Sequence, residues 1–214
     1  MRRRSDRRPS RVYAIADAGR IPAERLPHAI EEIAAAGVGT IQLRAKRLAD
    51  EALWEIARKT LRRLEGWAGT LWIDDRVDLA RMLPFDGVHL GQRDLDPADA
   101  RGQLPADTLI GLSTHDGEQI DVAERESTVD WLALGPIFPT ASKANPDPVV
   151  GLEGLRRLRS RTRRPLVAIG GIDADNLGAV LAAGADAAAV LSAICEGDVV
   201  ANCRRLVAAA GGAG

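Results

Sequence analysis

The sequence predicts a single α/β domain, a compact (β/α)8 or TIM barrel, from three observations. Eight short apolar segments of strand length alternate with eight segments of helical pattern along 214 residues. Strands this apolar, each followed by a helix, indicate a parallel sheet covered by helices. Four strands are entered through similar peptides, AGVGTIQL, PFDGVHLG, STVDWLALG and AGADAAAVL. Eight such units favour a closed barrel over an open doubly wound sheet.

The first half of the chain contributes four strands and four helices. Short apolar runs mark the strands, which we expect at residues 12–16, 40–43, 70–73 and 87–90. Apolar residues at helical spacing mark the helices, as with Leu26, Ile30 and Ile33 before the stop signal Gly37. The helices are expected at residues 25–36, 49–65, 77–83 and 97–102.

The second half repeats this order around one long loop. Strands are expected at residues 108–112, 129–134, 166–169 and 187–191, and helices at 118–126, 152–161, 174–183 and 199–210. Gly135 and Pro136 end the sixth strand, and a stretch rich in Pro, Ser, Thr, Asn and Asp follows. A loop of this length in a compact chain is usually functional or disordered.

Composition excludes several classes of protein. The net charge is −1, and four Trp, two Phe and one Tyr are too few for an aromatic nucleic-acid platform. Cys195 and Cys203 lack a metal-binding spacing, so we expect reduced thiols in a cytoplasmic protein. No apolar run is long enough to span a membrane. We therefore expect neither a nucleic-acid nor a membrane partner.

The N-terminus is unlike the rest of the chain. The first eleven residues, MRRRSDRRPSR, contain six arginines and no apolar face. We expect a disordered Arg-rich tail over residues 1–10 and one catalytic barrel over residues 11–214. A nucleic-acid-binding arm is the alternative.

Polar residues after the second and third strands are the first candidates for a site, because barrel active sites lie at the C-terminal strand ends. Gln42, Arg44 and Lys46 alternate with apolar residues, so they share one face toward the barrel mouth. Two cations and an amide in this arrangement suit a diphosphate. Asp75 after the third strand and Asp94 after the fourth suit Mg²⁺. Considered separately, Asp75 is better explained as a helix N-cap and Asp94 as a turn residue.

The later strand ends add hydroxyls, glycines and one lysine. Ser113 and His115 follow the fifth strand, and we expect no acidic partner beside the histidine, so a hydrolase triad is not expected. Lys143 lies in the long loop and suits the binding of phosphate oxygens. The alternative interpretation is a mobile surface loop with a solvated lysine. Gly171 and Ser192, after strands seven and eight, suit the phosphate site that many barrels use.

The motifs together resemble one family. QLRAK, IDDRVDLA, GVHLGQRDL, GLSTH, GPIFPTASK, AIGGI and VLSAI occur in this order across nearly the whole chain after Arg11. This set resembles the thiamine-phosphate synthase family. The resemblance implies Mg²⁺-dependent transfer of a hydroxymethylpyrimidine group from its diphosphate to the ring nitrogen of a thiazole phosphate. The implied products are thiamine phosphate and diphosphate.

The resemblance also implies a role for each matching position. Asp75 and Asp94 would bind Mg²⁺, and Arg44, Ser113 and Lys143 would act on the leaving diphosphate. The positions implied to hold the pyrimidine diphosphate are Gln42, Leu43, Arg44, Ala45, Lys46 and Asp74. Those implied to line the thiazole phosphate site are Thr140, Ala141, Ser142, Gly171, Leu191 and Ser192.

Two positions depart from the family pattern. Asp74 stands where the family usually has Asn in contact with the pyrimidine, and Ala45 replaces the acid of a motif that commonly reads REK. Asp75, Asp94 and Lys143 argue against the related thiazole tautomerases, which typically lack the metal aspartates. A non-catalytic sensor of thiamine intermediates is a further alternative. The sequence leaves open whether the chain forms a homo-oligomer.

Overall fold

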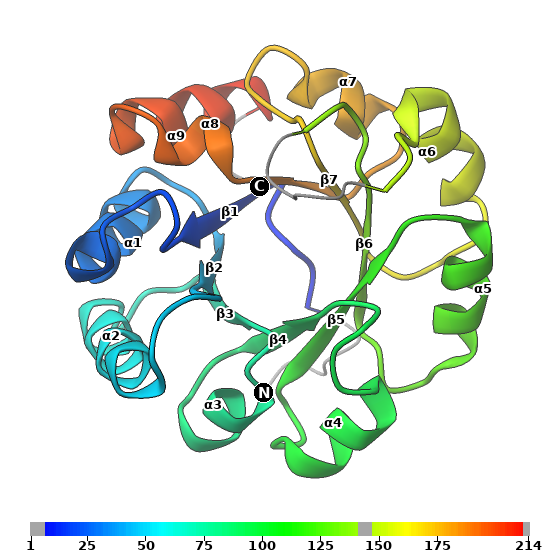
Figure 1. Ribbon diagram of the computed structural model, residues 1–214. Coiled ribbons are helices and arrows are strands. Elements are labelled where there is room, and N and C mark those ends of the chain that lie inside the picture. Colours follow the sequence, from blue (N-terminus) through cyan, green and yellow to red (C-terminus); the bar gives the residue numbers. More distant parts are fainter. Residues whose placement is uncertain (1–6, 141–146, 212–214) are drawn as a thin grey trace.

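Eight parallel strands close into a barrel in chain order, and β8 pairs with β1 (Figure 1). The computed structural model describes residues 7–140 and 147–211. The strands are β1 (Val12–Asp17), β2 (Thr40–Arg44), β3 (Thr70–Asp74), β4 (Gly87–Leu90), β5 (Leu109–Thr114), β6 (Trp131–Leu134), β7 (Leu166–Ile169) and β8 (Ala187–Val190). The predicted fold class is confirmed.

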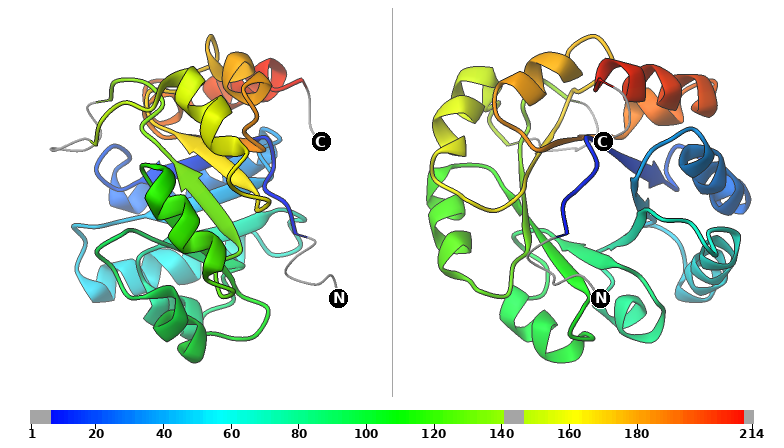
Figure 2. Two further views of the ribbon diagram at one scale, coloured as in Figure 1. Left: turned by 90° about the vertical axis from the view of Figure 1, so that its right-hand side faces the viewer. Right: turned by 180° about the vertical axis from the view of Figure 1, so that it is seen from behind.

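Helices form a ring around the strands (Figures 1 and 2). They are a short 3-10 helix η2 (Ala23–Arg25), then α1 (Leu26–Ala35), α2 (Asp50–Arg63), α3 (Val77–Met82), α4 (Pro97–Gln103), α5 (Gly117–Arg125), α6 (Gly151–Arg159), α7 (Leu177–Ala182), α8 (Ser192–Cys195) and α9 (Val199–Ala209). Neither η2 nor α8 was predicted from the sequence. Within the described ranges, no helix is long and apolar enough to cross a membrane.

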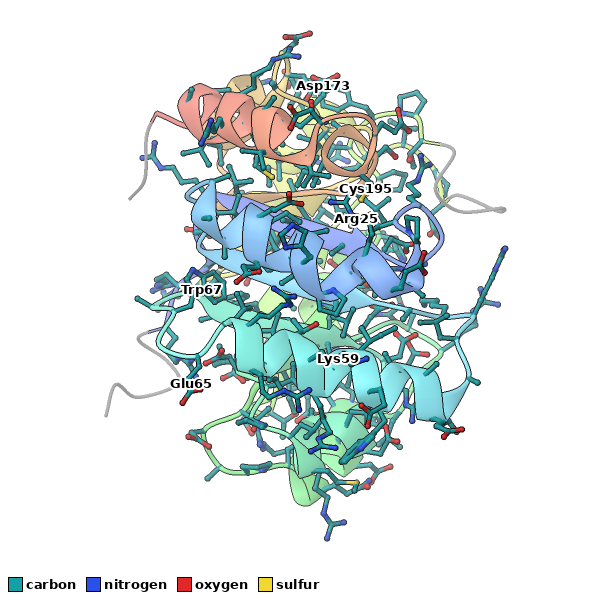
Figure 3. All side chains as sticks on the ribbon, turned by 90° about the vertical axis from the view of Figure 1, so that its left-hand side faces the viewer. Arg25, Lys59, Glu65, Trp67, Asp173 and Cys195 are labelled. Atoms are coloured by element: carbon teal, nitrogen blue, oxygen red, sulfur yellow. The ribbon has the colours of Figure 1, made fainter. Side chains whose placement is uncertain are left out.

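The core has two layers, because successive side chains of each strand point to opposite faces. Outward-facing residues such as Ile41 and Ile73 pack under the helices, together with Leu26 and Ile30 of α1. Charged side chains cover the outer surface of these helices, where Lys59 of α2 lies exposed (Figure 3). This layer attaches the helices to the barrel.

Aromatic rings fill part of the barrel interior. The Trp72 and Trp131 ring centroids are 4.4 Å apart, and Tyr13 lies 6.1 and 6.4 Å from them. Gly87 makes room for this cluster, since a Cβ there would lie 2.6 Å from the Trp72 ring. The barrel is therefore a packed core rather than a pore.

The four similar strand entries have a structural counterpart at the N-terminal end of the barrel. Asp86, Asp130 and Asp186 directly precede β4, β6 and β8. Each carboxylate accepts a hydrogen bond from a backbone N–H of the preceding strand, at 2.9, 2.8 and 2.8 Å. Gly39 occupies the same place before β2, where an added Cβ would lie 3.0 Å from Ser10. The repeated aspartate is therefore replaced by glycine at the position where the N-terminal segment packs.

Residues 7–10 cross the N-terminal opening of the barrel (Figure 2, right). The backbone oxygen of Arg7 accepts a hydrogen bond from the Trp131 indole at 3.0 Å, and the Arg7 guanidinium pairs with Asp86. Ser10 N donates to Thr40 Oγ1 at 2.9 Å. The expected disordered tail over residues 1–10 is therefore corrected for its last four residues, because the buried indole and the strand edge supply partners. Residues 1–6 lie outside the described part.

Candidate active site

The ends of β2 and β3 bring together the predicted cations and carboxylates. Arg44 Nε lies 3.4 Å from Asp74 Oδ2, and Lys46 Nζ lies 3.7 Å from the same oxygen. Lys46 Nζ is also 3.0 Å from Asp75 Oδ2. These contacts follow from the parallel pairing of β2 with β3, which places consecutive strand ends side by side.

Asp74 is the most buried acid of this group, with a side chain that is 9% exposed. Its Oδ2 atom has no hydrogen-bond partner among the described residues. Burial raises the pKa of Asp74 to about 7, the Asp75 charge adds to this rise, and Lys46 and Arg44 oppose it. A buried oxygen without a hydrogen bond carries a desolvation cost, so this position suits a hydrogen-bond donor that the described residues do not supply.

Asp75 adopts an uncommon backbone conformation, with φ at 60°. Its N–H donates to the carbonyl of His89 at 2.9 Å, which joins the β3 end to β4. Residues other than glycine adopt this left-handed conformation at a cost in conformational free energy, and such residues concentrate at functional sites. The N-cap of α3 is Arg76, and it makes no side-chain cap hydrogen bond, so Asp75 does not serve as the cap.

Asp75 and Asp94 lie beside one another. Burial raises the pKa of Asp75, Lys46 opposes this rise, and the charge of Asp94 and a hydrogen bond with it add to it. Asp94 Oδ2 also accepts a hydrogen bond from Gly91 N at 2.7 Å, so it serves the turn as well. A carboxylate whose pKa is raised by a neighbouring carboxylate gains from a bound cation.

The carboxylate pair fits Mg²⁺ in chemistry and ligand number. Within the described ranges, no three His, Cys, Asp or Glu side chains gather as a complete metal cage. Mg²⁺ does not need one, because it keeps several waters and binds through one or two carboxylates plus substrate phosphates. Asp75 and Asp94 would be the protein ligands.

Only alternate side chains of the QLRAK segment face the barrel. Gln42 is buried in the interior, where its Nε2 donates to Tyr13 Oη at 3.0 Å. Leu43 and Ala45 belong to the outer layer under the helices. Period-two alternation of the strand separates the two sets. The implied contacts of Leu43 and Ala45 with substrate can therefore involve their backbone atoms, not their side chains.

Ser113 lies at the end of β5 in a small polar network. His89 Nε2 is 2.9 Å from Ser113 Oγ, and Gln92 Nε2 donates to the Ser113 carbonyl at 2.6 Å. Neither His89 nor Gln92 was predicted to be a site residue from the sequence. The GVHLGQ motif that holds both residues was the available signal, since it ends β4 beside β5.

His115 has an acidic partner that lies far from it in sequence. Its Nδ1 is 2.6 Å from the Gly135 carbonyl, and its Nε2 is 3.4 Å from Asp147 Oδ2. The expectation that no acid stands near His115 is wrong in space. Both ring nitrogens contact oxygens at the two ends of the long loop, so the histidine links these ends.

The turns after β6 and β7 are interlocked. Phe138 N donates to Gly170 O at 3.0 Å. Gly171 has φ at 65°, and a Cβ there would lie 2.7 Å from both Phe138 Cβ and Pro139 O. Such close backbone approach with left-handed geometry requires glycine. The predicted phosphate-binding glycine is thus held against the segment that leads to Thr140.

The remaining candidates divide by whether the structure describes them. Leu191 and Ser192 lie at the start of α8, directly after β8. Thr140 is half-buried at the end of the described part of the loop. Ala141, Ser142 and Lys143 lie outside the described residues.

A hollow of about 290 Å³ opens on the outer side of the acidic group. Apolar residues of β2, β3, α2 and the β2–α2 loop line it together with charged residues. Its lining residues are Leu43, Ala45, Lys46, Leu48, Asp50, Leu53, Ile73, Asp74, Asp75 and Arg76. Arg76 pairs with Asp50 at 2.7 Å and with Asp78 at 2.6 Å, so it is not the cation partner of Asp74.

Comparison with known proteins assigns the family. The family model described as thiamine monophosphate synthase matches residues 12–194. Thiamine-phosphate synthases of Koribacter versatilis and Azorhizobium caulinodans are 46% and 41% identical, covering 85% and 91% of this chain and 87% and 91% of theirs. The solved structure of a thiamine phosphate pyrophosphorylase from Pyrococcus furiosus has a TM-score of 0.84 at 32% identity, covering 94% of this chain and 95% of that one. The chain belongs to the thiamine monophosphate synthase family.

Proposed function

We propose that the protein is a thiamine-phosphate synthase, a transferase of thiamine biosynthesis. It joins hydroxymethylpyrimidine diphosphate to a thiazole phosphate and releases diphosphate. The observation that carries this proposal, together with family membership, is the convergence of Arg44 and Lys46 on Asp74 and Asp75 at neighbouring strand ends. This arrangement has cations for a diphosphate and carboxylates for its metal ion.

The reaction needs charge stabilisation more than a base. The bond between the pyrimidine methylene and the diphosphate oxygen breaks, and its electron pair leaves with the diphosphate. The electron-rich aminopyrimidine stabilises the cationic methylene, which the thiazole nitrogen then attacks to form the new C–N bond. Arg44 and Lys46 stabilise the charge that develops on the leaving group, a role worth about 3 kcal/mol for one well-placed donor.

Mg²⁺ held by Asp75 and Asp94 would supply further positive charge to the diphosphate oxygens. Ser113 and Lys143 complete the diphosphate side in this proposal. Support for Ser113 comes from its fixed position, since His89 and Gln92 hold its hydroxyl and carbonyl. The role of Lys143 follows from the family motif alone, because the residue lies outside the described part of the chain.

We place the thiazole phosphate on the opposite side of the mouth, at the turns after β6, β7 and β8. Gly171, Leu191, Ser192 and Thr140 would line it, with Ala141 and Ser142 as the further motif positions. The close packing of Gly171 on the β6 turn supports this placement, because it orders the backbone that would donate to a phosphate.

Asp74 is proposed to accept a hydrogen bond from the pyrimidine amino group. Its buried Oδ2 atom lacks a hydrogen-bond partner among the described residues. Asn, the usual residue of the family, also presents an oxygen acceptor at this position. The exchange of Asn for Asp therefore keeps the contact that the substrate needs.

The test is turnover of the purified protein with both phosphorylated substrates and Mg²⁺, read by mass spectrometry. Formation of thiamine phosphate and diphosphate supports the synthase. A thiazole phosphate converted to its isomer without the pyrimidine substrate would instead identify a tautomerase. Binding without any conversion would identify a sensor. The free thiols Cys195 and Cys203 accord with a reducing compartment, and we place the reaction in the cytoplasm.

A further inference from the structure

We propose that Asp17 is a positioning residue that holds the guanidinium of Arg44 at the diphosphate site. The proposal rests on the proposed function. Asp17 ends β1, and the parallel register places it directly beside Arg44 at the end of β2. Arg44 Nη1 donates to Asp17 Oδ2, and the Asp17 side chain is only 8% exposed. A buried carboxylate that meets an arginine from the neighbouring strand forms a strong, directional contact.

Asp17 is itself rigidly held. Its Oδ1 atom accepts a hydrogen bond from Gly19 N at 2.6 Å. Its carbonyl accepts from the N–H groups of Arg20 and Ile21 at 3.0 and 2.9 Å. The turn is built against the carboxylate, since a Cβ at Gly19 would lie 2.7 Å from Oδ1. One carboxylate oxygen therefore orders the β1 turn, and the other is left for Arg44.

Arg44 lies between two acids from different strands. Its Nη1 contacts Asp17 on β1, and its Nε lies 3.4 Å from Asp74 Oδ2 on β3. These are its side-chain contacts among the described residues, and within that part of the chain the Nη2 N–H groups have no partner. The side chain is 26% exposed and thus accessible from the mouth. Two fixed acids at different edges of a planar guanidinium define its orientation.

Removing the Asp17 carboxylate would leave Asp74 as the acid in contact with the Arg44 guanidinium. Asp74 Oδ2 is buried and has no hydrogen bond from any described residue, so it would attract a guanidinium released from Asp17. Arg44 would then occupy the oxygen proposed for the pyrimidine amino group and also leave the diphosphate. We expect this loss to affect the pyrimidine diphosphate and not the thiazole phosphate.

The main experiment is steady-state kinetics on Asp17→Asn, with each substrate varied in turn. Asn retains the size of the side chain and an oxygen for Gly19 N. We expect kcat/KM for the pyrimidine diphosphate to fall roughly tenfold, as for the loss of one charge-assisted hydrogen bond. The KM for thiazole phosphate should stay within about twofold of the wild-type value. Asp130→Asn is the matched control, because this carboxylate binds a strand N–H at the opposite end of the barrel.

A double-mutant cycle separates positioning from a general structural effect. If Asp17 acts through Arg44, adding Asp17→Asn to Arg44→Ala should change kcat/KM by less than about twofold. An equal loss in both backgrounds would overturn the proposal, as would a change confined to the thiazole KM. Gly19→Ala displaces the same carboxylate and should also lower kcat/KM for the pyrimidine diphosphate. This variant tests the proposal if Asp17→Asn fails to fold.

Binding of inorganic diphosphate with Mg²⁺, measured by calorimetry, gives a readout that does not require turnover. We expect Asp17→Asn to weaken this binding roughly tenfold, and Asp130→Asn to leave it unchanged. Wild-type protein without turnover would refute the proposed function, while this binding comparison would still decide the role of Asp17. Unchanged diphosphate binding by Asp17→Asn would refute the positioning role.

Discussion

Asp74 should make the stability of the ligand-free protein fall as pH rises, and Asp74→Asn should remove this dependence. Burial raises the pKa of Asp74 from its ordinary 3.8 to about 7. Between these values the unfolded chain has lost the proton that the folded chain still holds. Stability therefore decreases with pH through this window, since the folded state binds more protons. Above about pH 7, the folded protein carries the full cost of the buried charge.

The size of the effect follows from the same shift. Each tenfold change in proton affinity corresponds to about 1.4 kcal/mol, so a pKa raised from 3.8 to about 7 amounts to about 4 kcal/mol. Structural relaxation and water entry reduce such costs, and we expect about 2–4 kcal/mol. This is a large part of the stability of an ordinary domain.

Urea unfolding at about pH 5 and pH 8, without Mg²⁺ or substrates, measures this difference. Asp74→Asn should gain stability relative to the wild type as pH rises between these values. Parallel pH dependence of the two proteins would show that Asp74 is not a buried acid with a raised pKa. Adding Mg²⁺ and diphosphate should offset the wild-type loss at pH 8, because binding stabilises the folded state.

The same variant tests the placement of the two substrates. Asp74→Asn should remain active, because both side chains present an oxygen acceptor to the pyrimidine amino group. Its KM for the pyrimidine diphosphate should change more than its KM for the thiazole phosphate. A change only in the thiazole KM would mean that Asp74 does not face the pyrimidine.

Three further predictions concern the metal, the loop and the N-terminus. Asp75→Ala or Asp94→Ala should lower kcat about a hundredfold or more, and full wild-type activity in excess EDTA would contradict a metal site. Lys143→Ala should depress kcat and leave the KM for thiazole phosphate nearly unchanged, which steady-state kinetics with each substrate varied can check. Deleting residues 1–6 should leave the melting temperature unchanged, whereas deleting residues 1–10 should lower stability by about 1–3 kcal/mol through loss of the partner of a buried indole. Equal melting temperatures for the two truncations would show that residues 7–10 contribute nothing.

The sequence alone predicted the barrel because its information is local and periodic. Apolar runs of strand length, helical spacing between them and glycine stop signals repeat eight times, and each repeat supports the others. The same periodicity placed Gln42 and Arg44 on one face of β2. Motif order then predicted the family, and the family model matches residues 12–194. Local rules suffice where a strand must bury one set of side chains and present the other.

Tertiary structure decided which residues meet. The Asp17–Arg44–Asp74 arrangement joins three strands, and His115 meets Asp147 across the long loop. These residues are far apart in sequence, so no local pattern predicts their contacts. Side-chain pairing depends on strand register and on the path of each turn.

Backbone detail and chain ends were also beyond the sequence. Asp adopts the left-handed conformation more often than most residues, but the sequence does not single out Asp75 for it; in the fold, Asp75 N–H donates to the His89 carbonyl of β4. Arg7 resembled the rest of a charged tail, yet its backbone satisfies the Trp131 indole at the barrel opening. Composition predicts disorder when a segment has nothing to bury. It cannot predict that a buried group elsewhere needs the segment's backbone as a partner.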